Sequence, residues 1–151
     1  MSTSATPAIR NRASLDTFSF NGFFELGGRI LLASLFLLSG LTKISSYGAI
    51  AGYMTAAGVP ASLLPIVIAT EVLGSLAIIV GWHTRIAAFL LAGFTLIAGA
   101  IFHNNFGDQI QLIMFLKDVS IAGAFLMLVA NGAGPLSIDR RRALSGGARQ
   151  R

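Results

Sequence analysis

The sequence has 151 residues, of which 54% are hydrophobic and only 11% are charged, with no cysteine and a net charge of +5. Soluble domains carry about 25% charged residues on their water-facing surfaces, so this composition excludes an ordinary soluble bundle. Without cysteine the chain has no disulfide, no iron–sulfur cluster and no thiol redox centre of its own.

Four apolar stretches are long enough to cross a membrane, at residues 26–44, 63–82, 86–102 and 110–130. About 20 residues of helix, rising 1.5 Å each, span a hydrocarbon core about 30 Å thick. The sequence therefore predicts an all-α, four-transmembrane-helix bundle, integral to the membrane, over residues 22–131. Residues 1–21 are expected to form a flexible cytoplasmic segment and residues 132–151 a solvated, basic cytoplasmic tail.

Positive charge is confined to one side of this predicted bundle. Arginines lie before the first stretch and after the last, and Arg85 lies in the turn between the second and third stretches. The loops at 45–62 and 103–109 contain neither lysine nor arginine. Because cytoplasmic loops are enriched in these residues, both termini are predicted to be cytoplasmic. A cleaved signal peptide is the rival interpretation of the first stretch, and Lys43 argues against it by interrupting the approach to the cleavage-like residues 49–51.

The outer loop between the first and second stretches contains Tyr47, Tyr53 and the turn 58–60. We expect it to form a short helix at the membrane interface. The basic tail is explained by membrane topology, so no nucleic-acid partner is predicted.

Five ionisable residues are predicted to converge in the outer half of the bundle. Such residues are costly inside a membrane and usually face the bundle interior, which makes each a functional candidate. Counting along the helices places Glu71, Lys117 and Asp118 at similar depths, roughly 10–12 Å from the outer ends of their helices. Lys43 and His103 lie at the outer ends of the first and third helices.

The adjacent residues Lys117 and Asp118 are about 100° apart around a helix, so they cannot both point at one spot. We expect Lys117 to pair with Glu71, and Asp118 to face Lys43 or His103. An equally open interpretation is that these charges are a structural ion-pair network that joins the helices.

At the inner end, Glu25 and Arg29 are four residues apart with the acid first, the favourable order for a helical ion pair. Arg29 is expected to extend to the lipid headgroups, and its alternative role is to close the cytoplasmic end of the bundle. His83 and His103 are separated by roughly 30 Å of helix, so they cannot share one metal or haem. No metal site and no covalently bound cofactor is predicted, and any redox chemistry would use a quinone or a partner's cofactor.

Several residues form a recognisable pattern across the four stretches, namely Gly28–Ala33, Leu38–Ile44, Gly58–Pro60, Glu71 with Gly74, Arg85, His103 and Lys117. This pattern resembles the DoxX family of small bacterial membrane proteins, and the resemblance covers roughly residues 22–140. Asp118 departs from it, since the resemblance implies asparagine after the lysine.

The resemblance implies a multi-pass protein of the bacterial inner membrane. Members are often described as oxidoreductases, because the family name comes from a subunit of a thiosulfate:quinone oxidoreductase. The function expected from it is the membrane subunit of a redox complex, with a quinone or small-anion pocket in the outer half and a redox partner protein. A non-catalytic scaffold, or a module that binds lipid or a small molecule, is the alternative. Homo-oligomerisation is left open.

Overall fold

The computed structural model describes residues 7–148, with side chains described over 21–145. The described residues form helices without strands, in the order α1 (Pro7–Ser45), α2 (Tyr47–Ala56), the 3-10 turn η1 (Ala61–Leu63), α3 (Leu64–Val80), α4 (Thr84–Phe102), α5 (Gln109–Asn131) and α6 (Ile138–Ala148). Four segments are long and apolar enough to cross a membrane, at Asn21–Ser45, Ala61–Val80, Thr84–Phe102 and Gln109–Asn131. The predicted all-α, four-span bundle is confirmed.

Three segments outside the predicted spans are also α-helical, namely the first part of α1, α2 and, in the tail, α6. The first helix begins at Pro7, although residues up to 21 were expected to be flexible; residues 1–6 lie outside the described part. Proline suits the first turn of a helix, and no proline or glycine interrupts residues 8–21. The outer loop contains α2, as expected, followed by a turn in which Gly58 has a φ of +78°.

The transmembrane helices pack as two pairs, α1 along α3 and α4 along α5, and α3 also contacts α4. Gly40, Gly74 and Gly99 allow close approach, because an added Cβ would lie 2.7, 3.1 and 3.0 Å from a side-chain atom of a neighbouring helix. At Gly93 and Gly123 an added Cβ would meet no atom within 4 Å, so these two glycines are not needed for close helix packing.

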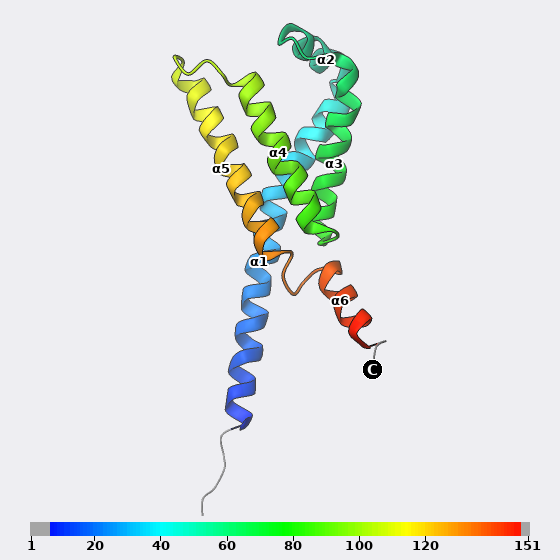
Figure 1. The fold of residues 1–151 in the computed structure, drawn as a ribbon, viewed down its shortest axis with the longest axis vertical. Coiled ribbons are helices and arrows are strands. Elements are labelled where there is room, and N and C mark those ends of the chain that lie inside the picture. Colours follow the sequence, from blue (N-terminus) through cyan, green and yellow to red (C-terminus); the bar gives the residue numbers. More distant parts are fainter. Residues whose placement is uncertain (1–6, 149–151) are drawn as a thin grey trace, which may run out of the picture.

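The buried core lies toward the end of the bundle from which the first part of α1 extends and near which α6 lies, called here the inner end (Figure 1). Its members come from all four spans and include Ala33, Ile78 and Leu91, with the rings of Phe36 and Phe125 meeting edge to face at 5.2 Å. Toward the opposite, outer end, which carries α2 and the α4–α5 loop, the two helix pairs spread apart (Figure 1). The apolar surface that faces away from the core is exposed, as expected for helices that contact lipid.

The chain beyond α5 turns back onto the inner end. Gly132 and Gly134 adopt positive φ angles of +81° and +75°, which end α5 and reverse the chain. Ser137 is then buried, and the amide of Asp139 donates to the carbonyl oxygen of Gly81 at 2.9 Å. The first part of the tail is therefore packed against the bundle, contrary to the expected solvated tail.

Candidate functional site

A cavity of about 570 Å³ lies between the two helix pairs in the outer half of the bundle. All five ionisable residues predicted to converge there line it, namely Lys43, Glu71, His103, Lys117 and Asp118. The remaining lining is mostly apolar and aromatic, from α1 to α5. The structure thus brings these five residues together around one cavity, which is called the outer cavity below.

Lys43 and Glu71 form the first polar group in the outer cavity. The Lys43 Nζ donates to both carboxylate oxygens of Glu71 at 2.9 Å and to the Ser39 Oγ at 2.6 Å. The Ser39 hydroxyl in turn donates to the Glu71 Oε1 at 3.2 Å. Glu71 is buried, whereas the Lys43 side chain keeps about 20% of its surface exposed. The carboxylate is thus fully hydrogen-bonded within a water-poor region.

The expected pairing of Glu71 with Lys117 is wrong, because Glu71 forms its ion pair with Lys43. The partner is decided by which helices lie next to each other. Helix α3 packs along α1, which carries Lys43, whereas α5 packs along α4. The Lys117 side chain is exposed at the cavity edge, where its Nζ lies 3.4 Å from the Met114 Sδ. It has no carboxylate within 4.0 Å among the described side chains, which leaves its charge available.

His103 and Asp118 form the second polar group. The His103 Nε2 lies 3.9 Å from the Asp118 Oδ2, and Nδ1 lies 2.9 Å from the Gln111 Oε1. With Gln111 assigned in this orientation, Nδ1 carries a proton and Nε2 is left to accept or share one. Asp118 packs against Gly99, where a side chain would displace it. Asp118 was expected to face Lys43 or His103, and in the structure its neighbour is His103.

Tyr53 and Phe102 add an aromatic wall to the outer cavity. Their rings are stacked with centroids 5.3 Å apart and an angle of 19° between planes. The cavity thus combines flat apolar walls with a cation–carboxylate group on α1 and α3 and a histidine–carboxylate group on α4 and α5. Within the described residues no three His, Asp or Glu side chains lie together as metal ligands. The chemistry available is hydrogen bonding, charge pairing and proton exchange.

At the inner end Arg29 is buried rather than extended to the lipid headgroups. Only 1% of its surface is exposed, and its guanidinium donates to the carbonyl oxygens of Ile78 at 3.2 Å and of Leu136. It therefore joins α1, the end of α3 and the tail, which is the alternative role of closing the bundle. Glu25 does not reach Arg29 within 4.0 Å; its carboxylate lies against Gly134 and supports Arg29 through longer-range attraction.

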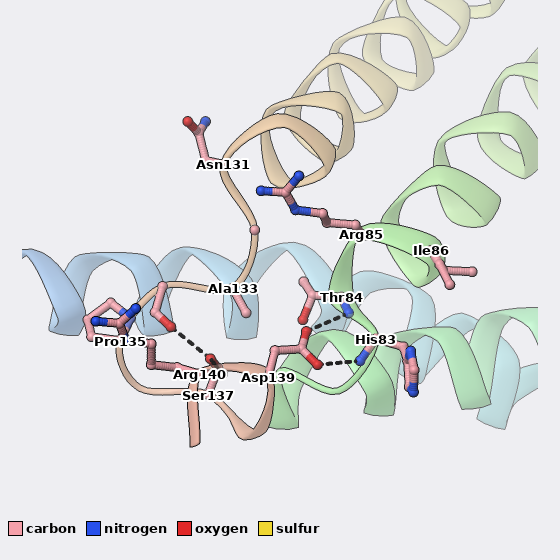
Figure 2. Close-up of a pocket in the computed structure, with 12 residues that line it drawn as sticks. His83, Thr84, Arg85, Ile86, Asn131, Ala133, Pro135, Ser137, Asp139 and Arg140 are labelled. Atoms are coloured by element: carbon pink, nitrogen blue, oxygen red, sulfur yellow. Dashed lines mark hydrogen bonds between the residues drawn. The ribbon is translucent and has the colours of Figure 1, made fainter. Parts of the chain in front are cut away.

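Asp139 is a second residue that fastens the tail, and the sequence analysis missed it. Its carboxylate accepts from the amides of His83 at 2.8 Å and Thr84 at 2.9 Å, at the start of α4 (Figure 2). Burial opposes ionisation and is the largest single influence, yet the hydrogen bonds from Thr84 and His83 together outweigh it and lower the pKa of Asp139. The one acid in an arginine-rich tail was the signal available in the sequence.

Ser39, Tyr53 and Gln111 also belong to the outer cavity or support it, and none was proposed from the sequence. Ser39 could have been found, since it lies one helical turn before Lys43 and on the same face. Gln111 stands near the start of α5, and only the loop geometry brings it to His103.

Comparison with known proteins agrees with this architecture. The family model described as DoxX matches residues 24–104, more than half of the chain. The chain belongs to the DoxX family. The match includes Lys43, Glu71 and His103 and ends before Lys117 and Asp118.

Two relatives from Escherichia coli (strain K12) are similar over most of their length. Inner membrane protein YqjF is 45% identical over 115 residues, covering 76% of this chain and 88% of the relative. Inner membrane protein YphA is 37% identical over 120 residues, covering 75% and 86%. No solved structure matches the chain. The DoxX-family member described here is accordingly a multi-pass protein of the inner membrane.

Proposed function

We propose that this chain is the membrane subunit of a redox complex and that its outer cavity binds a quinone headgroup, with both termini in the cytoplasm. The observation that carries the proposal is that five ionisable residues from four helices line one cavity inside an otherwise apolar bundle. Charged groups at membrane depth are costly, and they typically mark substrate or proton pathways.

The lining suits a flat ring with a carbonyl oxygen at each end. Tyr53 and Phe102 offer an aromatic face, and Lys43 would donate to an oxygen at one side of the cavity by giving up one of its three bonds to Glu71 and Ser39. On the opposite side, Lys117 has no carboxylate partner among the described side chains, and His103 would donate from Nε2 with both ring nitrogens protonated beside Asp118. A bound quinone would supply the electron-accepting chemistry, with electrons delivered by a partner protein.

The chain's own groups would hold and move protons. Glu71, Asp118 and His103 are the proton-exchanging groups of the cavity, and each lies beside a cation or a second titratable group. A general acid or base must lie within hydrogen-bonding reach of the reacting oxygen, which a ring between the two polar groups would satisfy. Glu71 would act with Lys43, and His103 with Asp118.

The test is titration of a short-chain ubiquinone analogue into the purified protein in lipid nanodiscs, followed by calorimetry. Lys117→Met and His103→Phe should each weaken binding by about tenfold, as expected when a charged or polar donor is lost in an apolar site. Ser120→Ala is the control, since this exposed hydroxyl bonds only within α5. Equal binding by all variants would remove the cavity assignment. Displacement of the analogue by a small inorganic anion would reassign the site to anions.

A scaffold role is the second candidate, and the fully satisfied Glu71 favours it. A carboxylate that already accepts from Lys43 and Ser39 resembles a structural ion pair that joins α1 to α3. Under this alternative the analogue would not bind at all, while replacement of Lys43 or Glu71 would still reduce stability.

A further inference from the structure

A second pocket, of about 640 Å³, lies at the inner end where three transmembrane spans stop. Its walls are the α3–α4 turn, the end of α5 and the start of the tail (Figure 2). The spans end at Val80 and Asn131 and begin again at Thr84, so the pocket lies at the level of the lipid headgroups. This pocket is called the inner pocket below.

Two arginines, Arg85 and Arg140, line the inner pocket, and both side chains are exposed. Neither has a carboxylate within 4.0 Å among the side chains that the structure describes. Figure 2 shows Arg85 extended toward the end of α5, on the side away from Asp139, and Arg140 beside Pro135. Two guanidinium groups without a protein anion therefore border one concavity.

The acid that also lines the inner pocket, Asp139, is already engaged. Both of its oxygens accept backbone amides, from His83 and Thr84. This leaves the pocket with more uncompensated positive than negative charge. Guanidinium groups match phosphate oxygens through paired hydrogen bonds, so the chemistry favours a phosphate group.

The surroundings of the inner pocket distinguish a lipid from a soluble anion. Ile86, next to Arg85, lines the pocket and is 60% exposed, which offers an apolar surface to an acyl chain. Trp82 is exposed in the same turn, and the Arg142 guanidinium lies 6.0 Å from its ring centroid. Tryptophan and arginine at the end of a span are typical of the membrane interface.

We propose that the inner pocket binds the headgroup of an anionic phospholipid such as phosphatidylglycerol. Arg85 is the principal phosphate ligand, Arg140 supplies a second cation, and Ile86 contacts the acyl chain. Basic pockets between membrane helices recognise anionic headgroups in this manner. The site is independent of the outer cavity.

Native mass spectrometry of the purified full chain tests the proposal, with phosphatidylglycerol and phosphatidylcholine compared as probes. The wild type should retain phosphatidylglycerol preferentially, and Arg85→Gln should reduce its affinity by about tenfold. Arg140→Gln should give a smaller loss in the same direction. Arg141→Gln is the matched control, because it removes the same charge from α6 without touching the inner pocket.

Four results would overturn the proposal. Equal losses for Arg141→Gln and Arg85→Gln would show attraction by diffuse surface charge. Displacement of the lipid by millimolar inorganic phosphate would show a site for soluble anions. An unchanged preference for phosphatidylglycerol in Arg85→Gln would show that Arg85 does not bind the lipid and only contacts the end of α5. If Arg85→Gln does not fold, Arg85→Lys keeps the charge but loses the paired hydrogen bonds, and a lipid affinity equal to wild type would equally refute the assignment.

Discussion

The Lys43–Glu71 pair provides a quantitative test of how this bundle tolerates buried charge. At an effective dielectric constant of about 20, two unit charges 2.9 Å apart attract by about 6 kcal/mol. Removing each ion from water costs several kcal/mol, so the net contribution of the pair is much smaller than its attraction. Loss of one partner, however, leaves the other unpaired in a region where Glu71 is only 3% exposed.

We therefore expect Lys43→Met and Glu71→Gln each to lower the free energy of unfolding by about 3–5 kcal/mol. The double variant should be more stable than either single variant, because no isolated charge remains. Lys117→Met is the matched control, since it removes a lysine that lines the same cavity but has no carboxylate partner among the described side chains. Its expected cost is below about 1 kcal/mol.

Reversible unfolding in mixed micelles, followed by circular dichroism, measures the wild type and all four variants. The coupling energy follows from the double-mutant cycle. Additive losses in the double variant would refute the reasoning, because they would mean that Lys43 and Glu71 stabilise the fold independently. A loss for Lys117→Met as large as that for Lys43→Met would instead restore the pairing of Glu71 with Lys117.

Three further predictions concern the inner end and the His103 region. Arg29→Met should cost about 2–4 kcal/mol in the same unfolding assay, because the carbonyl oxygen of Ile78, in a buried hydrogen bond, and that of Leu136, in a partly buried one, lose a charged donor. The lowered pKa of Asp139 means that its stabilising effect is present above its ordinary value of 3.8 and is lost as the pH falls through the lower folded value. Fluorescence of the chain's single tryptophan, which lies in the adjacent turn, should report this acid transition, and Asp139→Asn should abolish it. Gly99→Ala should push Asp118 away from its histidine neighbour and change the NMR chemical shifts of that imidazole, whereas Gly93→Ala, with open space around it, should not.

The sequence predicted depth along the helices well and helix neighbours poorly. Counting residues from the start of each span placed Glu71, Lys117 and Asp118 at one level, and all three line the outer cavity. Which lysine meets Glu71 depends on which helices are adjacent, and apolar periodicity carries little such information when lipid and protein interior are equally apolar. Close packing of α1 against α3, through Gly40, decided that Lys43 is the partner.

Two predictions for the inner end were wrong, namely that Arg29 extends to the lipid headgroups and that the tail is solvated. Both assumed that a charged residue or segment is exposed. Arg29 lies near the start of a span, where extension to the headgroups is the usual outcome. Its burial depends on two carbonyl oxygens that can accept from it, that of Ile78 at the end of α3, which also accepts from the Gly81 amide, and that of Leu136 in the returning tail. These acceptors come close to Arg29 only when segments distant in the sequence pack together, so the residues around Arg29 could not predict them. The same holds for Asp139, whose partners are the amides that begin α4.

The two ends of the bundle are stabilised by different contacts. At the inner end, Arg29 and Asp139 tie the tail to α1, α3 and α4, and the buried core fills the adjacent half. That closure permits the helix pairs to separate toward the outer end, where Lys43 and Glu71 still link α1 to α3 (Figure 1). A uniformly packed bundle would leave no volume for a ligand, and a buried charge such as Glu71 would be costly in the membrane without its partner. Close packing at one end and the Lys43–Glu71 pair at the other satisfy both conditions, and the proposed binding of a ligand in the outer cavity depends on both.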